Sequence, residues 1–115
     1  MYALKFLRRE NDLNKVIKSQ KRDRSKLKIL FISLWDDWSL KLVEALKEKY
    51  GSSTEGERLF IVDSFSMPHS FVIYGTSSVP QLVALNRDKV TVEARLPVIY
   101  HNLLPTKSKK YGSRI

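Results

Sequence analysis

Hydrophobic and polar positions along the chain alternate between stretches typical of strands and stretches typical of helices. Residues 28–35 and 58–65 are largely apolar runs, as in strands that are buried on both faces. Residues 11–24 and 37–50 place apolar side chains at helical spacing, which predicts amphipathic helices. The order of these patterns predicts a domain that mixes helices and strands.

Shorter patterns complete the expected order, which is β-α-β-α-β-α-β-β-α. Residues 2–7 predict a first strand, and short helices are expected at residues 68–74 and 97–104. Residues 81–86 and 89–96 are joined by a short turn and predict an antiparallel hairpin. In its second strand, one face is expected to hold Val90, Val92, Ala94 and Leu96.

The second long helix has clear start and stop signals. Asp36, Asp37 and Ser39 supply capping groups and early negative charge, and Gly51 is a natural stop. Its predicted buried stripe consists of Trp38, Leu42, Val43, Leu46 and Tyr50. This stripe favours packing for Trp38, whereas Trp35, at the end of the preceding strand, is expected to be exposed.

The chain length and the element order together indicate a single domain. The 115 residues suffice for one core. Strands and helices alternate along most of the chain, and a hairpin follows near its end. This order predicts an α/β fold, with a mixed central sheet and helices on both faces. We expect residues 1–105 to form this domain and residues 106–115 to be a basic flexible tail.

Composition excludes several kinds of chemistry. The sequence has no cysteine, which rules out disulfides, thiol catalysis and cysteine zinc sites. Its longest apolar run is too short to cross a bilayer, and the start lacks a long signal segment. The expected location is intracellular and cytoplasmic by default, and a removed transit peptide leaves an organelle open.

Positive charge gathers at the two ends of the chain. The net charge is +9, and residues 29–106 contribute only seven basic residues against nine acidic ones. Such ends fit an acidic partner, which would be nucleic acid, an anionic membrane surface or an acidic protein, or they are simply solvated. The candidate contact residues are Lys15, Lys18, Lys21, Arg22, Arg24, Lys26, Lys28, Lys107, Lys109, Lys110 and Arg114.

Local motifs in this order resemble the thioredoxin family over about residues 11–104. Thioredoxins carry Trp-Cys-x-x-Cys between a buried strand and a helix, where this chain has Trp35-Asp36-Asp37-Trp38-Ser39. The Asp, Pro, Tyr-Gly and apolar-Pro positions of the family match Asp63, Pro68, Tyr74-Gly75 and Val79-Pro80. The resemblance implies a thioredoxin-like fold and a cis peptide bond before Pro80.

Departures from the family pattern imply a redox-inactive member. Asp36 and Ser39 stand at the two cysteine positions, and the family's buried acid maps near Leu30. Thiol–disulfide exchange requires a thiolate, which neither replacement can supply. What the resemblance still implies is a groove for extended peptide, formed by Trp35, Asp36, Asp37, Trp38, Ser39, Ser78, Val79 and Pro80.

Other candidate sites are weaker. Asp36 and Asp37 could form a carboxylate pair, although helix capping suits their position better. His69 and His101 have no metal-ligand spacing, so we expect no metal and no cofactor.

The expected function is a non-catalytic thioredoxin-fold module that binds protein or acts as a scaffold, as a small subunit of a larger assembly. The alternative is a ribonucleoprotein-type basic protein that contacts the phosphate backbone of nucleic acid through its ends. A transferase that uses Ser39 is a third class.

Overall fold

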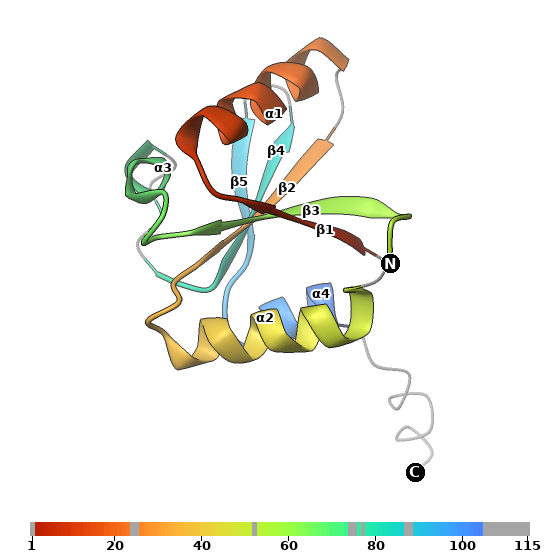
Figure 1. Ribbon diagram of the computed structural model, residues 1–115, viewed down its shortest axis with the longest axis vertical. Coiled ribbons are helices and arrows are strands. Elements are labelled where there is room, and N and C mark those ends of the chain that lie inside the picture. The colour runs from red at the N-terminus through yellow and green to blue at the C-terminus, as the bar shows by residue number, and fades with distance from the viewer. Residues whose placement is uncertain are drawn as a thin grey trace.

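Five strands and four helices make up the computed structural model, which describes residues 2–23, 26–51, 53–73, 76, 78–86 and 89–104 (Figure 1). In chain order the elements are β1 (Tyr2–Leu7), α1 (Glu10–Asp23), β2 (Lys26–Ile32), α2 (Asp37–Tyr50), β3 (Glu57–Asp63), α3 (Pro68–Ile73), β4 (Gln81–Asn86), β5 (Lys89–Ala94) and α4 (Val98–Leu103). This order confirms the one predicted from the hydrophobic pattern. Gly75 and the predicted tail, residues 106–115, lie outside the described residues.

The sheet is mixed, as predicted. Its strands lie in the order β1-β3-β2-β4-β5, with β1, β3 and β2 parallel and the last two antiparallel to their neighbours. Figure 1 shows α1 on one side of the sheet and α2 with α4 on the other. Because β2 is central, its apolar run is covered on both faces and its side chains from Ile29 to Ile32 are buried.

Each face of the sheet has its own hydrophobic core. Under α1 and α3 the core includes Leu13, Phe31, Phe60 and Met67, with Phe31 packed edge-on against the ring of Phe71. Under α2 and α4 lies a second core. It contains Leu30, Leu42, Leu46, Leu59 and Ile99. Leu30, the position of the family's buried acid, is therefore an ordinary core residue.

Both predicted buried strands end earlier than expected. The β2 strand ends at Ile32 rather than at residue 35, and β3 ends at Asp63 rather than at residue 65. Apolar residues that follow these ends, including Trp35 and Phe65, are exposed. A run of apolar side chains does not show where the chain leaves a sheet, because the loop residues here are apolar as well.

Two further predictions, about which side chains of α2 and of β5 lie together on one face, are wrong. Ser39, not Trp38, lies on the buried stripe of α2, and Trp38 is 54% exposed. The predicted common face of the last strand is broken by a register shift between Leu82 and Val83.

Because of this bulge, side chains before and after it in β5 point to opposite faces of the sheet. Val92 lies opposite Val83, a residue of the α1 core, but is itself 42% exposed, whereas Ala94 lies opposite Leu82 and is buried with it in the α2 core. A β-bulge changes the alternation of side chains, and it has no clear signal in the sequence.

Candidate functional site

The loop between β2 and α2 holds the positions that resemble the thioredoxin motif. Asp36 is the N-cap of α2, and its carboxylate accepts hydrogen bonds from the Ser39 backbone N–H at 2.9 Å and from its hydroxyl at 3.0 Å. The Ser39 hydroxyl oxygen also accepts from the backbone N–H of Ser33 at 3.2 Å. The interpretation of Asp36 as a helix cap is confirmed. Its oxygens hold the loop together.

Asp63 links this loop to the next one. Its carboxylate, at the end of β3, accepts from the backbone N–H of Leu34 at 2.9 Å and of Ser66 at 3.2 Å. The residue is buried, and its backbone carbonyl accepts from Met67 N–H at 2.9 Å. One carboxylate thus fixes the loops after β2 and β3 relative to each other. The sequence marked Asp63 only through the resemblance.

Large apolar side chains stand on these two fixed loops and face solvent. Trp35 is 81% exposed and Phe65 is 71% exposed, and their ring centroids are 6.4 Å apart. Leu34 is also exposed. We call Leu34, Trp35 and Phe65 the apolar loop surface, and Trp38 follows it on the first turn of α2.

Phe65 was missed because it was assigned to a buried strand. The signal that could have found it is Asp63 followed three residues later by Ser66. Aspartate with a nearby serine favours a turn, which ends the strand before residue 65.

The second predicted part of the groove lies at the same edge of the sheet. Phe31 pairs with Gln81 across antiparallel strands, so the chain before β4 and the chain after β2 leave the sheet together. The Val79–Pro80 peptide bond is cis, as the resemblance implies. Ser78 is exposed, Val79 is half-buried and Pro80 is buried.

The predicted groove residues therefore do not all reach solvent. Trp35, Asp37, Trp38 and Ser78 are exposed, whereas Ser39 and Pro80 are buried. A partner at this edge would touch the first four directly. Ser39 lies beneath this edge, where its hydroxyl forms hydrogen bonds with Asp36 and with the backbone of Ser33.

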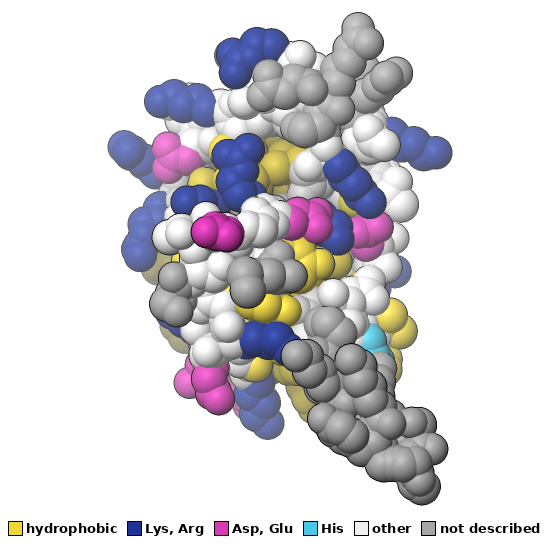
Figure 2. Space-filling view, turned by 90° about the vertical axis from the view of Figure 1, so that its right-hand side faces the viewer, with side chains coloured by type: hydrophobic (Ala, Val, Ile, Leu, Met, Phe, Trp, Pro, Cys, Tyr) yellow, Lys and Arg dark blue, Asp and Glu magenta, His cyan; other side chains and the backbone are white. Residues whose placement is uncertain are grey.

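The predicted basic residues separate into two groups. Lys15, Lys18, Lys21 and Arg22 are exposed on α1, from its middle to its end. Figure 2 shows basic side chains spread over the upper part of one face, with acidic ones across its middle. Arg24, Lys107, Lys109, Lys110 and Arg114 lie outside the described residues.

Lys26 and Lys28 are tied to acidic residues instead. Lys26 lies 3.6 Å from the Glu93 carboxylate, and Lys28 lies 3.6 Å from that of Glu57 and 3.9 Å from that of Glu93. The Lys28 ammonium also donates to the Tyr2 hydroxyl at 3.4 Å. These contacts place Lys28 on the α2 side of the sheet, away from the exposed basic residues of α1.

The surroundings of Lys28 also change its pKa. Burial alone would lower the pKa, but the hydrogen bond to Tyr2 and nearby negative charge, from Tyr2, Glu57 and Glu93, outweigh it. The pKa of Lys28 therefore lies above its ordinary value of 10.5.

Two kinds of site are absent from the part of the chain that the structure describes. No group of three or more His, Cys, Asp or Glu side chains there could hold a metal ion. No helix among the described elements is long and apolar enough to cross a membrane.

Comparisons with known proteins bear on the fold. No protein-family model and no curated protein matches this sequence. Among solved structures, a Schistosoma mansoni thioredoxin is 17% identical, with a TM-score of 0.65 over 88% of this chain and 93% of that one. The Nicotiana alata thioredoxin NaTrxh is 13% identical, with a TM-score of 0.65 over 97% and 92%.

A third similar structure is the germline-specific thioredoxin Deadhead of Drosophila melanogaster. It is 19% identical, with a TM-score of 0.61 over 96% of this chain and 99% of that one. At such identities the likeness concerns the fold. This chain therefore has a thioredoxin-like fold and no cysteine with which to carry out thiol–disulfide exchange.

Proposed function

We propose that this chain is a non-catalytic protein-binding module, a small subunit of a larger assembly, whose partner covers the apolar loop surface. The observation that carries this proposal is the 81% exposure of Trp35 beside the ring of Phe65. Tryptophan is favoured as a buried anchor at protein interfaces, and adjacent exposed apolar side chains mark interaction sites. Covering both rings would remove them from water.

The rigidity of this surface supports the same role. Leu34 and Ser66 donate their backbone N–H groups to Asp63, and Asp36 caps the helix that follows Trp35. Aromatic rings on loops that are already fixed lose little conformational freedom on binding. A partner therefore gains most of the energy of covering them.

The chain before β4 suits a partner in extended conformation. Ser78 and Val79 precede β4 at the edge where the Trp35 loop begins. A peptide can add to such an edge through backbone hydrogen bonds, a mode that needs no cysteine. The resemblance implies the same groove.

The polar groups of the motif support a role without catalysis. The side chains of Asp36 and Ser39 bond to each other, and Ser39 is fully buried. A nucleophile must reach its substrate. In this arrangement the Ser39 hydroxyl is out of reach.

The test is affinity capture of partners from native extract with the tagged chain and its variants. Trp35→Ala and Phe65→Ala should each reduce the captured partner at least tenfold, as is typical of interface anchors. Val90→Ala removes a half-exposed apolar side chain from β5 and serves as the matched control. Equal capture by all variants would refute the proposal.

A second candidate is contact with the phosphate backbone of nucleic acid, favoured by the four exposed basic residues of α1. Capture repeated after nuclease treatment separates the two candidates. If binding is to nucleic acid, its logarithm falls linearly with log salt, with a slope of about −0.7 to −0.9 per phosphate contact. Deleting residues 106–115 should then make that slope shallower. Retention of the same proteins after nuclease favours the protein-binding module.

A further inference from the structure

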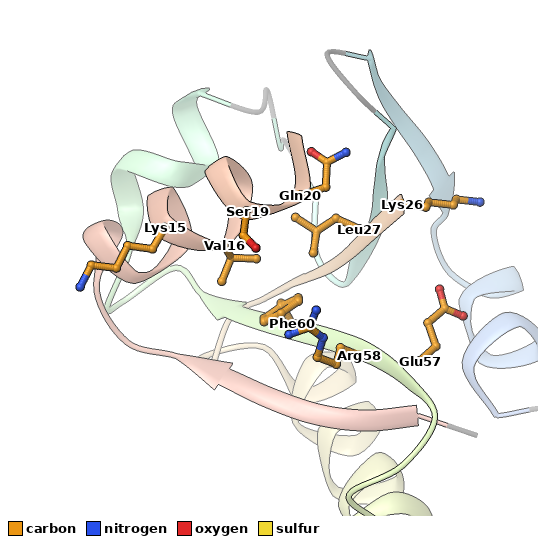
Figure 3. A pocket seen from close by; sticks show the side chains of 9 residues that line it. All are labelled: Lys15, Val16, Ser19, Gln20, Lys26, Leu27, Glu57, Arg58 and Phe60. Atoms are coloured by element: carbon orange, nitrogen blue, oxygen red, sulfur yellow. The ribbon is translucent and has the colours of Figure 1, made fainter. Parts of the chain in front are cut away.

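A cavity of about 280 Å³ opens between the middle of α1 and the starts of β2 and β3 (Figure 3). Its apolar lining consists of Leu27 and Phe60, which form the floor on β2 and β3, and of Val16, which faces them from α1. Ser19 and Arg58 lie around the floor, and Lys15 extends outward from α1 at one side. An apolar floor with a few polar groups is the usual composition of a ligand site.

The cavity exists because α1 has too few apolar side chains to fill it. Leu13 is buried and Val16 and Ile17 are half-buried, but the inner positions that follow are Ser19 and Gln20. A serine occupies far less volume than the leucine or isoleucine that would extend the stripe. Phe60 and Leu27 consequently have space above them.

Two of the charges that line the cavity are already compensated. Lys26 pairs with Glu93 at 3.6 Å, and Glu57 pairs with Lys28 at 3.6 Å. Both partners, Glu93 and Lys28, are absent from the lining. These two pairs leave no net charge on the cavity.

The other two lining charges are both positive. Among the residues that the structure describes, no carboxylate lies within 4.0 Å of the Lys15 ammonium or the Arg58 guanidinium. The guanidinium carbon of Arg58 is 5.7 Å from the centre of the Phe60 ring, at the edge of the apolar floor. Lys5, which pairs with Phe60 across β1 and β3, is a third exposed cation on this side of the sheet.

The geometry points to a binding site for a small organic anion, in which a phosphate or carboxylate group is attached to a compact apolar body. The apolar body would lie on Val16, Leu27 and Phe60. The anionic group would meet Arg58, whose planar guanidinium can donate two parallel hydrogen bonds to two oxygens. The size of the cavity, just below that of sites for drug-sized ligands, suits a molecule with a single ring.

A second guanidinium stands near the same rim. Arg22 donates a hydrogen bond to the Ser19 hydroxyl oxygen at 3.3 Å. Arg22 is not itself in the lining but is bonded to Ser19, which is, whereas Lys15 and Arg58 border the cavity from α1 and β3. Cations on both elements make the surroundings of the cavity positive, which favours an anion.

This site is distinct from the apolar loop surface. The cavity lies where β2 and β3 begin, and the apolar loop surface lies where they end. The seven residues of β2 separate the two by about 20 Å. A ligand here would leave the loop surface uncovered.

The test is a titration of the ¹⁵N-labelled chain with phenyl phosphate, followed by the backbone amide signals. Saturable shifts are expected at Val16, Ser19, Leu27 and Phe60. Inorganic phosphate has the charge without the ring, and benzyl alcohol has the ring without the charge. Each should bind about tenfold more weakly than phenyl phosphate. Benzoate distinguishes a carboxylate ligand from a phosphate one.

Two variants test the residues, and a third is the control. Arg58→Gln should weaken phenyl phosphate binding about tenfold, whereas Arg9→Gln, at an exposed arginine before α1, should leave it unchanged. Ser19→Leu should fill the cavity and abolish saturable binding. If that variant does not fold, the comparison of phenyl phosphate binding by Arg58→Gln and by Arg9→Gln still tests the proposal.

The inference is overturned by either of two results. One is that inorganic phosphate binds as well as phenyl phosphate, with shifts spread over all exposed basic residues. The other is that the two arginine variants bind equally. Both would show general attraction of anions to a basic surface.

Discussion

Where β2 and β3 end, the polar groups of the loops bond to one another and aromatic rings face solvent. Where the same strands begin, the apolar side chains Leu27 and Phe60 lie inside and the charged groups of Lys15 and Arg58 face outward. The first arrangement leaves an apolar surface exposed. The second offers a small cavity with a positive rim. One sheet thus presents opposite chemistry at its two ends, because different loops and helices cover them.

The two ends differ in what holds them together. At the loop end, the carboxylates of Asp36 and Asp63 accept backbone hydrogen bonds, and the exposed rings contribute little to folding. At the other end, Phe60 is part of the core beneath α1. Stability and surface chemistry are therefore carried by different residues, which the following variants can separate.

The largest expected contrast is between two phenylalanines five positions apart. Phe60→Ala should lower the free energy of unfolding by about 3–5 kcal/mol, because Phe60 is 5% exposed and its loss leaves a void. Phe65→Ala should change it by about 0.5 kcal/mol or less, because that ring is already in water. Urea unfolding of both variants measures the difference, and equal losses would mean that Phe65 is packed in solution.

The next effect concerns the carboxylate that joins the two loops. Asp63→Ala should cost about 2–3 kcal/mol, because it leaves the N–H groups of Leu34 and Ser66 without their charged acceptor. Asp63→Asn keeps one acceptor oxygen and should cost less. Urea midpoints compare the two, and the assignment fails if the asparagine variant is the less stable one.

A smaller loss is expected at the start of α2. Asp36→Ala removes the N-cap and should cost about 1 kcal/mol. Asp37→Ala, one position later, is the matched control and should cost only a few tenths through the helix dipole. Thermal unfolding of the pair checks this order. A reversed order would place the cap at Asp37.

The smallest effect is a loss of stability at high pH that arises where the strands begin. Burial, and then the charge of Tyr2, raises the pKa of Tyr50 above its ordinary value of 10.0, and the pKa of Lys28 is raised as well. A raised pKa in the folded state gives stability that is complete below the unfolded value. That stability is lost as the pH rises through the folded value.

Unfolding midpoints in urea from pH 8 to pH 11 measure this loss. The midpoint should be flat at first and fall above about pH 10. Tyr50→Phe cannot ionise and should show a shallower fall, although it also loses the 3.0 Å hydrogen bond to the Leu103 carbonyl. The explanation fails if the fall is equally steep in both chains.

Much of the fold could be predicted because its signals are local. The apolar run of β2, the helical spacing of Leu42 and Leu46, and the short turn before β5 each depend on neighbouring residues only. The cap at Asp36 is local too, since its partner is Ser39. The exposure of Trp35 was expected from its place at the end of a strand.

The errors concern choices between two packing arrangements. Trp38 and Ser39 differ by 100° around α2, and the more apolar residue is the one that faces solvent. Val92 and Ala94 lie on opposite faces of the sheet because a bulge shifts the register by one residue, and only Ala94 is buried. Lys28 carries the same charge as Lys15, yet it lies on the other side of the sheet, where Glu57 and Glu93 pair with it.

The sequence by itself determined the order of the elements, the α/β class and the absence of thiol chemistry, because these depend on local pattern and on residue types. The tertiary structure alone decided that Trp38 rather than Ser39 stays in water and which charges remain uncompensated. Phe65 is exposed because Asp63 turns the chain away from the sheet. Arg58 borders an open cavity because Ser19 lies where a larger side chain would fill it. The contact of Asp63 with Leu34 and the meeting of Ser19 with Arg58 at the cavity join residues that are distant in sequence and come together only when the chain folds.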